Sequence, residues 1–265
     1  MKKKKDVFLV VTVICGLLVI GFILLPLLKM FTSPSWENLK AAIQDKKVVK
    51  SIWLSIYTAG LAAIISFVVG TPFAYFLARR EFFGRKVIES IIDLPMVIPH
   101  PVVGIAILSV VGRNYWFGQI LSKIGIRVMG SVLGIVTVLT FVGIPFYINT
   151  AKDGFESISP RLENVSRSLG ASMFSTFLRI TFPLAWRSIL VGIVMCSARA
   201  ISEFGAVVVI AYHPMTAPVM IYERFEAYGL AYSQPVAVLL TLVCLILFLF
   251  LRVLSLKHQE GKLIK

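Results

Sequence analysis

Residues 7–28 read VFLVVTVICGLLVIGFILLPLL, an apolar run that decides which class of fold the chain can adopt. As a helix rising about 1.5 Å per residue, this run would extend roughly 33 Å, which is enough to cross a bilayer. It is longer than the apolar region of a typical signal peptide, and no A-x-A cleavage pattern follows it. We therefore expect a first transmembrane helix that is retained in the mature protein.

Apolar stretches of similar character recur along the rest of the chain. They lie at about residues 51–78, 87–111, 131–150, 187–212 and 231–254. Hydrophobic residues make up 58% of the chain and charged residues 15%, whereas soluble domains average about 45–50% and about 25%. The sequence thus predicts an all-α, polytopic membrane protein with six transmembrane helices. Because the third stretch contains Pro95, Pro99 and Pro101, we do not expect its first half to form a regular helix.

The distribution of basic residues predicts how the chain is oriented. If the N-terminus lies in the cytoplasm, the segments on that side hold roughly twice as many Lys and Arg residues as the outer segments, the bias that sets orientation in membranes. We therefore expect a multi-pass protein of the cell membrane with both termini cytoplasmic. The same bias explains the net charge of +14 without nucleic acid as a partner. Cys15, Cys196 and Cys244 lie in apolar runs and show no metal-ligand spacing.

The segment between the fourth and fifth stretches is too polar to span a membrane, yet it is patterned. Pro160 stands where a helix can begin, and Gly170 stands where one can end. Between them, one helical face carries Leu162, Val165 and Leu169. A second apolar set leads to Pro183, so the segment reads as helix, glycine turn, helix and proline break. The apolar face needs a cover, which could be the chain's own helix ends, a partner protein or the membrane surface.

This segment resembles the signature of ABC importer permeases, E-A-A-x-x-x-G followed after nine residues by I-x-L-P. Gly170 takes the glycine position, Ile180 follows at the right distance, and Pro183 closes the pattern with Phe182 in place of leucine. None of the E-A-A letters is kept, and Glu163 lies one position early. The resemblance assigns ATPase coupling to Glu163, Asn164, Val165, Ser166, Arg167, Ser168, Leu169, Gly170, Ala171, Ile180 and Pro183.

The resemblance implies a type I, binding-protein-dependent importer fold whose coupling helix docks into a separate ATPase dimer. The chain has no G-x-x-x-x-G-K-[ST] phosphate loop, so ATP-Mg would be bound by that partner, and the chain itself is neither an enzyme nor a cofactor-binding protein. It also implies a homodimer and an extracytoplasmic binding protein. The expected organisation is a helix and outer segment (1–47), a transmembrane domain (48–254) with the coupling loop at 156–183, and a cytoplasmic tail (255–265).

A charged pair interrupts the fifth apolar stretch near its middle. Arg199 and Glu203 are four residues apart, so in a helix they would share a face and pair. Such a pair either neutralises itself within the packing or lies along the transport path. The run SARAISEFGAVVVIA (197–211) resembles the fifth helix of oxyanion permeases, which makes Arg199, Glu203, Phe204 and Gly205 the candidates for the path or gate.

The segment that follows, YHPMTAPVMIYERFEAYGL (212–230), is similar to archaeal molybdate/tungstate permeases. The resemblance therefore implies molybdate or tungstate as substrate, with sulfate or thiosulfate as the alternative. An ion-coupled secondary transporter would need inverted repeats, which the sequence does not show. His100, between two prolines, is interpreted as a packed or loop residue. Gly104, Gly134 and Gly143 are interpreted as sites of close helix packing.

Overall fold

The computed structural model describes the backbone of residues 2–260 and the side chains of residues 7–249. Residues 261–265, the end of the predicted tail, lie outside the described residues. In chain order the helices are α1 (Lys2–Thr32), α2 (Trp36–Gln44), α3 (Lys46–Arg79), α4 (Arg85–Val97), α5 (His100–Val111), α6 (Trp116–Lys123), α7 (Val132–Glu156), α8 (Pro160–Ser168), α9 (Met173–Thr176), the π-helix η1 (Phe177–Thr181), α10 (Phe182–Ile201), α11 (Gly205–Ile210), α12 (Ala217–Tyr228) and α13 (Leu230–Glu260). The predicted all-α class is confirmed.

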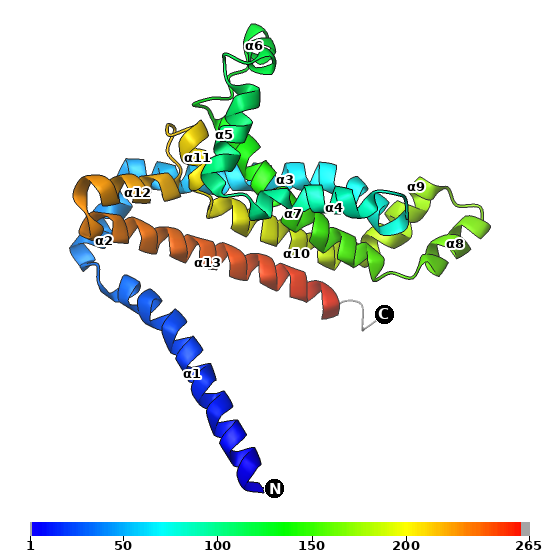
Figure 1. Ribbon diagram of the computed structural model, residues 1–265, viewed down its shortest axis with the longest axis horizontal. Helices are drawn as coiled ribbons and strands as arrows, with labels where there is room; N and C mark the ends of the chain where they lie inside the picture. Colours follow the sequence, from blue (N-terminus) through cyan, green and yellow to red (C-terminus); the bar gives the residue numbers. More distant parts are fainter. Residues whose placement is uncertain (1, 261–265) are drawn as a thin grey trace.

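The long helices form one bundle (Figure 1). Helix α7 packs against both α3 and α10, and α10 also contacts α13. Helix α1 leaves the bundle on one side, while α5 and α6 project on the other. Helices α8 and α9 lie together at one end of the bundle, here called the loop end, and α2 and α12 lie at the opposite, far end. The two ends are therefore built from different parts of the chain.

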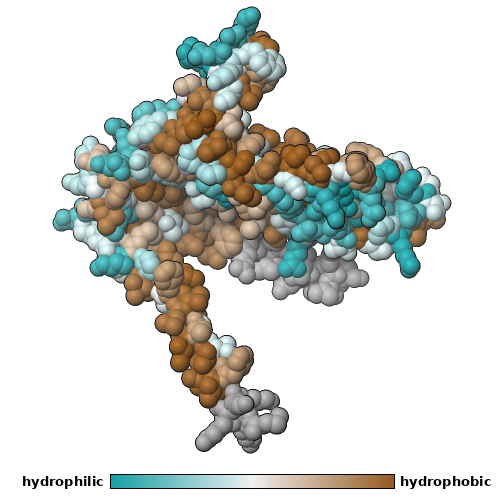
Figure 2. Space-filling model, viewed as in Figure 1, coloured by the Kyte–Doolittle hydropathy of each residue, from teal (hydrophilic) through white to brown (hydrophobic). Residues whose placement is uncertain are grey.

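Among the residues that the structure describes, five helices are long and apolar enough to cross a membrane, and a bent pair supplies a sixth span if it is counted as one. The five are Val7–Thr32, Lys46–Arg79, Val132–Glu156, Met173–Ile201 and Leu230–Leu249. The pair is α4 with α5, where the chain bends by 113°. Hydrophobic residues cover α1 and α5 in Figure 2, whereas hydrophilic residues gather towards the two ends of the bundle. This distribution suits a protein whose bundle is surrounded by lipid.

The break in the third span lies later than the sequence suggested. Pro95 is inside α4, so the first half of this stretch is helical and the expectation of an irregular first half is wrong. The helix ends instead at Ile98, whose ψ of 133° is extended, because the residue before a proline is disfavoured in the helical region. Pro99 then caps α5, which continues at a steep angle.

The fifth span also differs from its prediction at both ends. It begins at Met173 rather than near residue 187, and Pro183 does not break it. The π-helix η1 precedes this proline, and the N–H of Phe182 bonds to the carbonyl of Phe177. A π-turn shifts the hydrogen-bond ladder by one residue, which helps to accommodate a residue without an N–H. The helix then ends at Ile201, and α11 starts after a short break.

Glycines bring the central helices into close contact, as the sequence suggested for three of them. A Cβ at Gly143 of α7 would lie 2.7 Å from Cys196 Sγ of α10, and one at Gly154 would lie 2.2 Å from Ser188 Cβ. Gly104 and Gly134 both lie against α11, where an added Cβ would be 2.8 Å from Val209 Cβ and 2.9 Å from Ile210 Cγ2. Small residues of this kind let helix backbones approach closely in membranes.

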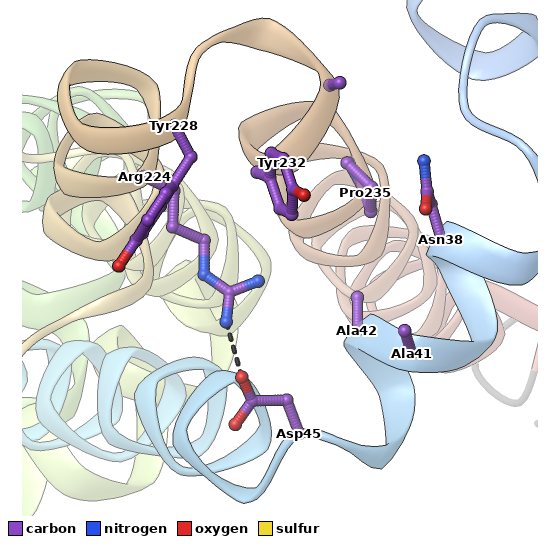
Figure 3. Close-up of a pocket in the computed structure, with 9 residues that line it drawn as sticks. Asn38, Ala41, Ala42, Asp45, Arg224, Tyr228, Tyr232 and Pro235 are labelled. Atoms are coloured by element: carbon purple, nitrogen blue, oxygen red, sulfur yellow. Dashed lines mark hydrogen bonds and ion pairs between the residues drawn. The ribbon is translucent and has the colours of Figure 1, made fainter.

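At the far end, an ion pair joins α12 to the junction between α2 and α3, beside a pocket of about 350 Å³ (Figure 3). Arg224 of α12 donates to Asp45, which also accepts from the backbone N–H of Lys47 and so caps α3. Burial alone would raise the pKa of Asp45, but the Lys47 N–H and the Arg224 guanidinium outweigh it and hold that pKa below its usual value. Asp45 therefore stays ionised at neutral pH and fixes the start of α3.

We predict that Gly154→Ala destabilises the α7–α10 contact, because its new methyl group would meet Ser188 at a distance real side chains do not adopt. Overpacking of this kind costs about 1–3 kcal/mol. Gly60→Ala is the matched control, since a Cβ at Gly60 has no neighbour within 4 Å. Thermal unfolding in detergent should show a lower midpoint for Gly154→Ala alone. Equal midpoints for the two variants would contradict this packing.

Candidate functional site

The loop end carries the predicted short helix. Helix α8 begins at Pro160, and the chain turns at Gly170, whose φ of +90° lies in the region that favours glycine. The predicted apolar face is present and largely exposed, with Leu162 at 47%, Val165 at 60% and Leu169 at 83%. The chain's own helix ends therefore do not cover this face, which removes one of the three covers considered from the sequence.

Glu163, on the opposite side of α8, holds the helix against the bundle. Its carboxylate pairs with Nε of Arg79 at 2.8 Å and accepts from the hydroxyls of Tyr75 at 3.0 Å and Thr181 at 2.9 Å. Arg79 also donates to the carbonyl oxygens of Phe155 and Ile158. Since the Glu163 side chain is only 10% exposed, this is a buried, fully used carboxylate. It joins α8 to α3 and to η1.

The remaining coupling candidates fall into two groups. Residues 163–171 lie together in α8 and the turn after it, where Ser166 and Thr176 join α8 to α9 through their hydroxyls at 3.1 Å. Ile180 and Pro183 instead belong to η1 and α10, the start of the fifth span. The structure thus places the two halves of the sequence pattern on α8 with its turn and on the spanning helix that follows it.

The charged pair of the fifth span forms across a helix end, with Arg199 in the last turn of α10 and Glu203 beyond it. Arg199 Nη2 lies 2.7 Å from Glu203 Oε2. The sequence suggested that Glu203 lies near the middle of a helix. Helix α10 instead ends at Ile201, so Glu203 lies in the break before α11. There its second oxygen accepts the backbone N–H of Ala206 at 2.9 Å, at the start of α11. The carboxylate is 1% exposed, so its charge is balanced entirely within this cluster.

His100 completes the cluster and was missed by the sequence interpretation. Its Nε2 lies 2.7 Å from Arg199 Nη2. A guanidinium can only donate, so the ring nitrogen that it meets acts as the acceptor. The signal available in the sequence was Pro99-His100-Pro101 within an apolar stretch, where a histidine at a helix break has no hydrophobic reason to be present.

The other two path candidates lie at the start of α11, where Gly205 faces α5 and Phe204 faces α12. A Cβ at Gly205 would be 3.0 Å from His100 Cβ and 3.2 Å from Pro101 Cδ. Phe204 packs on Tyr222 of α12, with ring centroids 4.8 Å apart. All four candidates, Arg199, Glu203, Phe204 and Gly205, are therefore brought together where the breaks of two spans meet.

A bundle of membrane-crossing helices, an exposed amphipathic helix at one end and a charged cluster at paired helix breaks define a membrane subunit of a transporter. The family described as binding-protein-dependent transport system inner membrane component matches residues 70–265. The chain belongs to this family and is a permease subunit of a binding-protein-dependent ABC system, a class whose relatives are named as transport and not as catalytic subunits.

Curated relatives match along nearly their whole length. The molybdate/tungstate transport system permease protein WtpB of Pyrococcus furiosus is 41% identical, over 89% of this chain and 91% of that protein. WtpB of Methanocaldococcus jannaschii is 40% identical, over 87% and 90%. The sulfate transport system permease protein CysT of Synechocystis is more distant, at 30% identity over 93% and 87%.

A solved structure shares the fold at low sequence identity. A bacterial ABC transporter involved in the import of the acidic polysaccharide alginate matches with a TM-score of 0.75 and 19% identity, covering 97% of this chain and 98% of that one. The predicted fold of an ABC importer permease is therefore confirmed. The likeness extends to the fold and no further.

We predict that Glu163→Gln loosens the loop end, because Arg79 would keep its charge without a carboxylate partner. Breaking a buried ion pair costs about 3–5 kcal/mol. Glu156→Gln is the control, since that carboxylate forms an exposed pair with Arg85, worth below about 1 kcal/mol. Limited trypsin digestion should cut the Glu163→Gln variant faster at Arg161 and Arg167. Equal digestion of both variants would show that Glu163 is not the anchor.

Proposed function

We propose that this chain is the membrane-spanning subunit of an ATP-driven importer for molybdate and tungstate. The observation that supports this proposal is the sequence identity to two permeases named for these oxyanions. The identity is 41% and 40%, over 91% and 90% of the length of those relatives. A sulfate or thiosulfate permease is the alternative, supported by the more distant likeness to CysT. An ion-coupled secondary transporter has no support from the family to which the chain belongs.

The partner at the loop end is an ABC ATPase dimer. Its support is the exposed apolar face of α8, which the chain itself leaves uncovered. An amphipathic helix of this kind is recognised by a hydrophobic groove. In this proposal residues 163–171, Ile180 and Pro183 act as the coupling segment, and ATP-Mg is held by the ATPase alone.

The loop end then faces the cytoplasm, with both termini on that side, and the far end meets an extracytoplasmic binding protein. The excess of Lys and Arg in the corresponding loops supports this orientation. Two copies of the chain form the path between them. A 42% exposed His100 beside a 1% exposed Glu203 supports a cluster with one side open towards that path.

Transport in this scheme alternates between two states of the dimer. ATP binding closes the two ATPases and moves both α8 helices, and the helices around Arg199 and Glu203 open outward to receive the anion. Hydrolysis reverses the movement. The breaks at Ile98 and at residues 202–204 are the natural hinges, because helix ends absorb changes in backbone angles more easily than helix interiors.

Uptake measurements test the substrate. Proteoliposomes would hold the chain, its ATPase and its binding protein, and they would be offered labelled molybdate or tungstate with excess sulfate. We expect ATP-dependent uptake that sulfate barely reduces, because the relatives with higher identity are named for molybdate and tungstate. Uptake of sulfate in preference to both would favour the alternative, and ATP-independent uptake would contradict the importer itself.

Coupling should depend on the turn at Gly170, since any other L-residue at a φ of +90° is strained. Such strain costs about 1–3 kcal/mol, so we expect Gly170→Val to reduce ATP-dependent uptake about fivefold or more. Gly170→Asn should retain more uptake, because asparagine enters this region more readily. Gly125→Val controls for strain alone, as Gly125 has a φ of +80° outside the coupling segment. Equal uptake by all three variants would argue against a rigid turn.

A further inference from the structure

The only acidic side chain between residues 157 and 181 is turned inward. The Glu163 carboxylate accepts hydrogen bonds from Arg79, Tyr75 and Thr181, and the residue is only 8% exposed. A partner protein that docks on α8 therefore meets no carboxylate from this segment. Any charged contact at that interface must use the side chains that remain on the surface.

Those remaining charges are all positive. Arg161, Arg167 and Arg179 are exposed, and none has an ion-pair partner within the described residues. Asn164, which occupies the position where the signature places its glutamate, is exposed and neutral. The exposed surface of this segment thus combines an apolar strip with arginines, and its charge is of one sign.

One of these arginines lines a hollow beside the docking helix. A pocket of about 210 Å³ is lined by Arg79, Arg80 and Arg167, with Asn164, Met173 and Thr176 among its other walls. A wider hollow of about 570 Å³ shares Asn164, Arg167 and Met173 with it. Because Glu163 neutralises Arg79, the uncompensated cations at this place are Arg80 and Arg167.

We propose that the groove of the ATPase that receives α8 presents an aspartate or glutamate side chain to Arg167, with Arg80 beside it. This inference rests on the proposed function and names the chemistry of its partner surface. A carboxylate matches a guanidinium in shape and charge and can accept two parallel hydrogen bonds. The apolar strip on Leu162, Val165 and Leu169 supplies contact area, and the charged pair fixes the register in which the helix enters the groove.

The test is a charge reversal in the full complex. The permease dimer in nanodiscs would be titrated with the separately purified ATPase of the same transporter. We expect Arg167→Glu to weaken binding at least about tenfold, because like charges would then face each other across the contact. Arg179→Glu is the matched control, since Arg179 is an exposed arginine of the same segment that lines neither hollow. Its affinity should stay within about twofold of wild type.

A reciprocal change identifies the partner residue. Each carboxylate in the ATPase groove would be changed to arginine in turn, and one such variant should restore the binding of Arg167→Glu while weakening that of the wild-type permease. Raising KCl from about 50 to about 500 mM should weaken the wild-type complex more than the Arg167→Glu complex, because salt screens an attraction that only the former has.

The outcomes separate this inference from the docking itself. Unchanged or tighter binding by Arg167→Glu, or an equal loss in Arg179→Glu, would overturn the proposed carboxylate contact. Leu162→Asp tests docking independently, since it places a charge on the apolar strip. If Leu162→Asp also leaves the ATPase bound, α8 is not the docking helix and the proposed function fails at that point. Thermal unfolding of each permease variant alone would confirm that its bundle is intact.

Discussion

A bilayer offers no water to backbone groups, so each span must satisfy its own N–H and C=O groups, and every helix break needs partners supplied by the protein. This chain breaks two spans, after Val97 and after Ile201, and places the two breaks against each other. Glu203 accepts a backbone N–H at one break, and Arg199 reaches His100 at the other. The charged cluster thus lies where two helix breaks meet, and its Glu203 carboxylate satisfies one backbone group at the break before α11, whatever further role the cluster has in transport.

At the loop end, too, a single buried carboxylate makes several contacts, and it joins three helical segments. Glu163 contacts α3 through Arg79 and Tyr75 and the fifth span through Thr181. Through this single side chain the orientation of α8 is tied to the bundle, which leaves the apolar face of α8 directed outward. A helix that presents its apolar side to a partner must be anchored through its polar side. In α8 the contacts of Glu163 provide this anchor.

Hydrophobic periodicity and composition were enough to predict three features: the apolar stretches, the start of α8 at Pro160 and the turn at Gly170. These features depend on the local chemistry of the chain. The arrangement of charged side chains was not predictable in the same way. From the sequence, Glu163 resembled the glutamate of the signature shifted by one position. Its actual partner, Arg79, lies 84 positions away. His100 and Arg199 are 99 positions apart. Such pairs depend on how spans pack, which a single sequence does not display. The prediction at Pro183 was wrong for a different reason. Proline normally breaks a helix, but here a π-turn before Pro183 lets the helix continue through it.

That overridden rule matters for the proposed mechanism. If Pro183 ended a helix, α8 would be joined to the charged cluster only by flexible chain. Instead, Met173–Ile201 is one span of 29 residues, about 44 Å long at about 1.5 Å per residue. Its first turns carry Thr181, which is bonded to Glu163, and its last turn carries Arg199. In the proposed mechanism, a displacement of α8 would act on one end of a continuous helix whose other end lies at the break. That helix physically connects the two candidate sites, because it carries both Thr181 and Arg199.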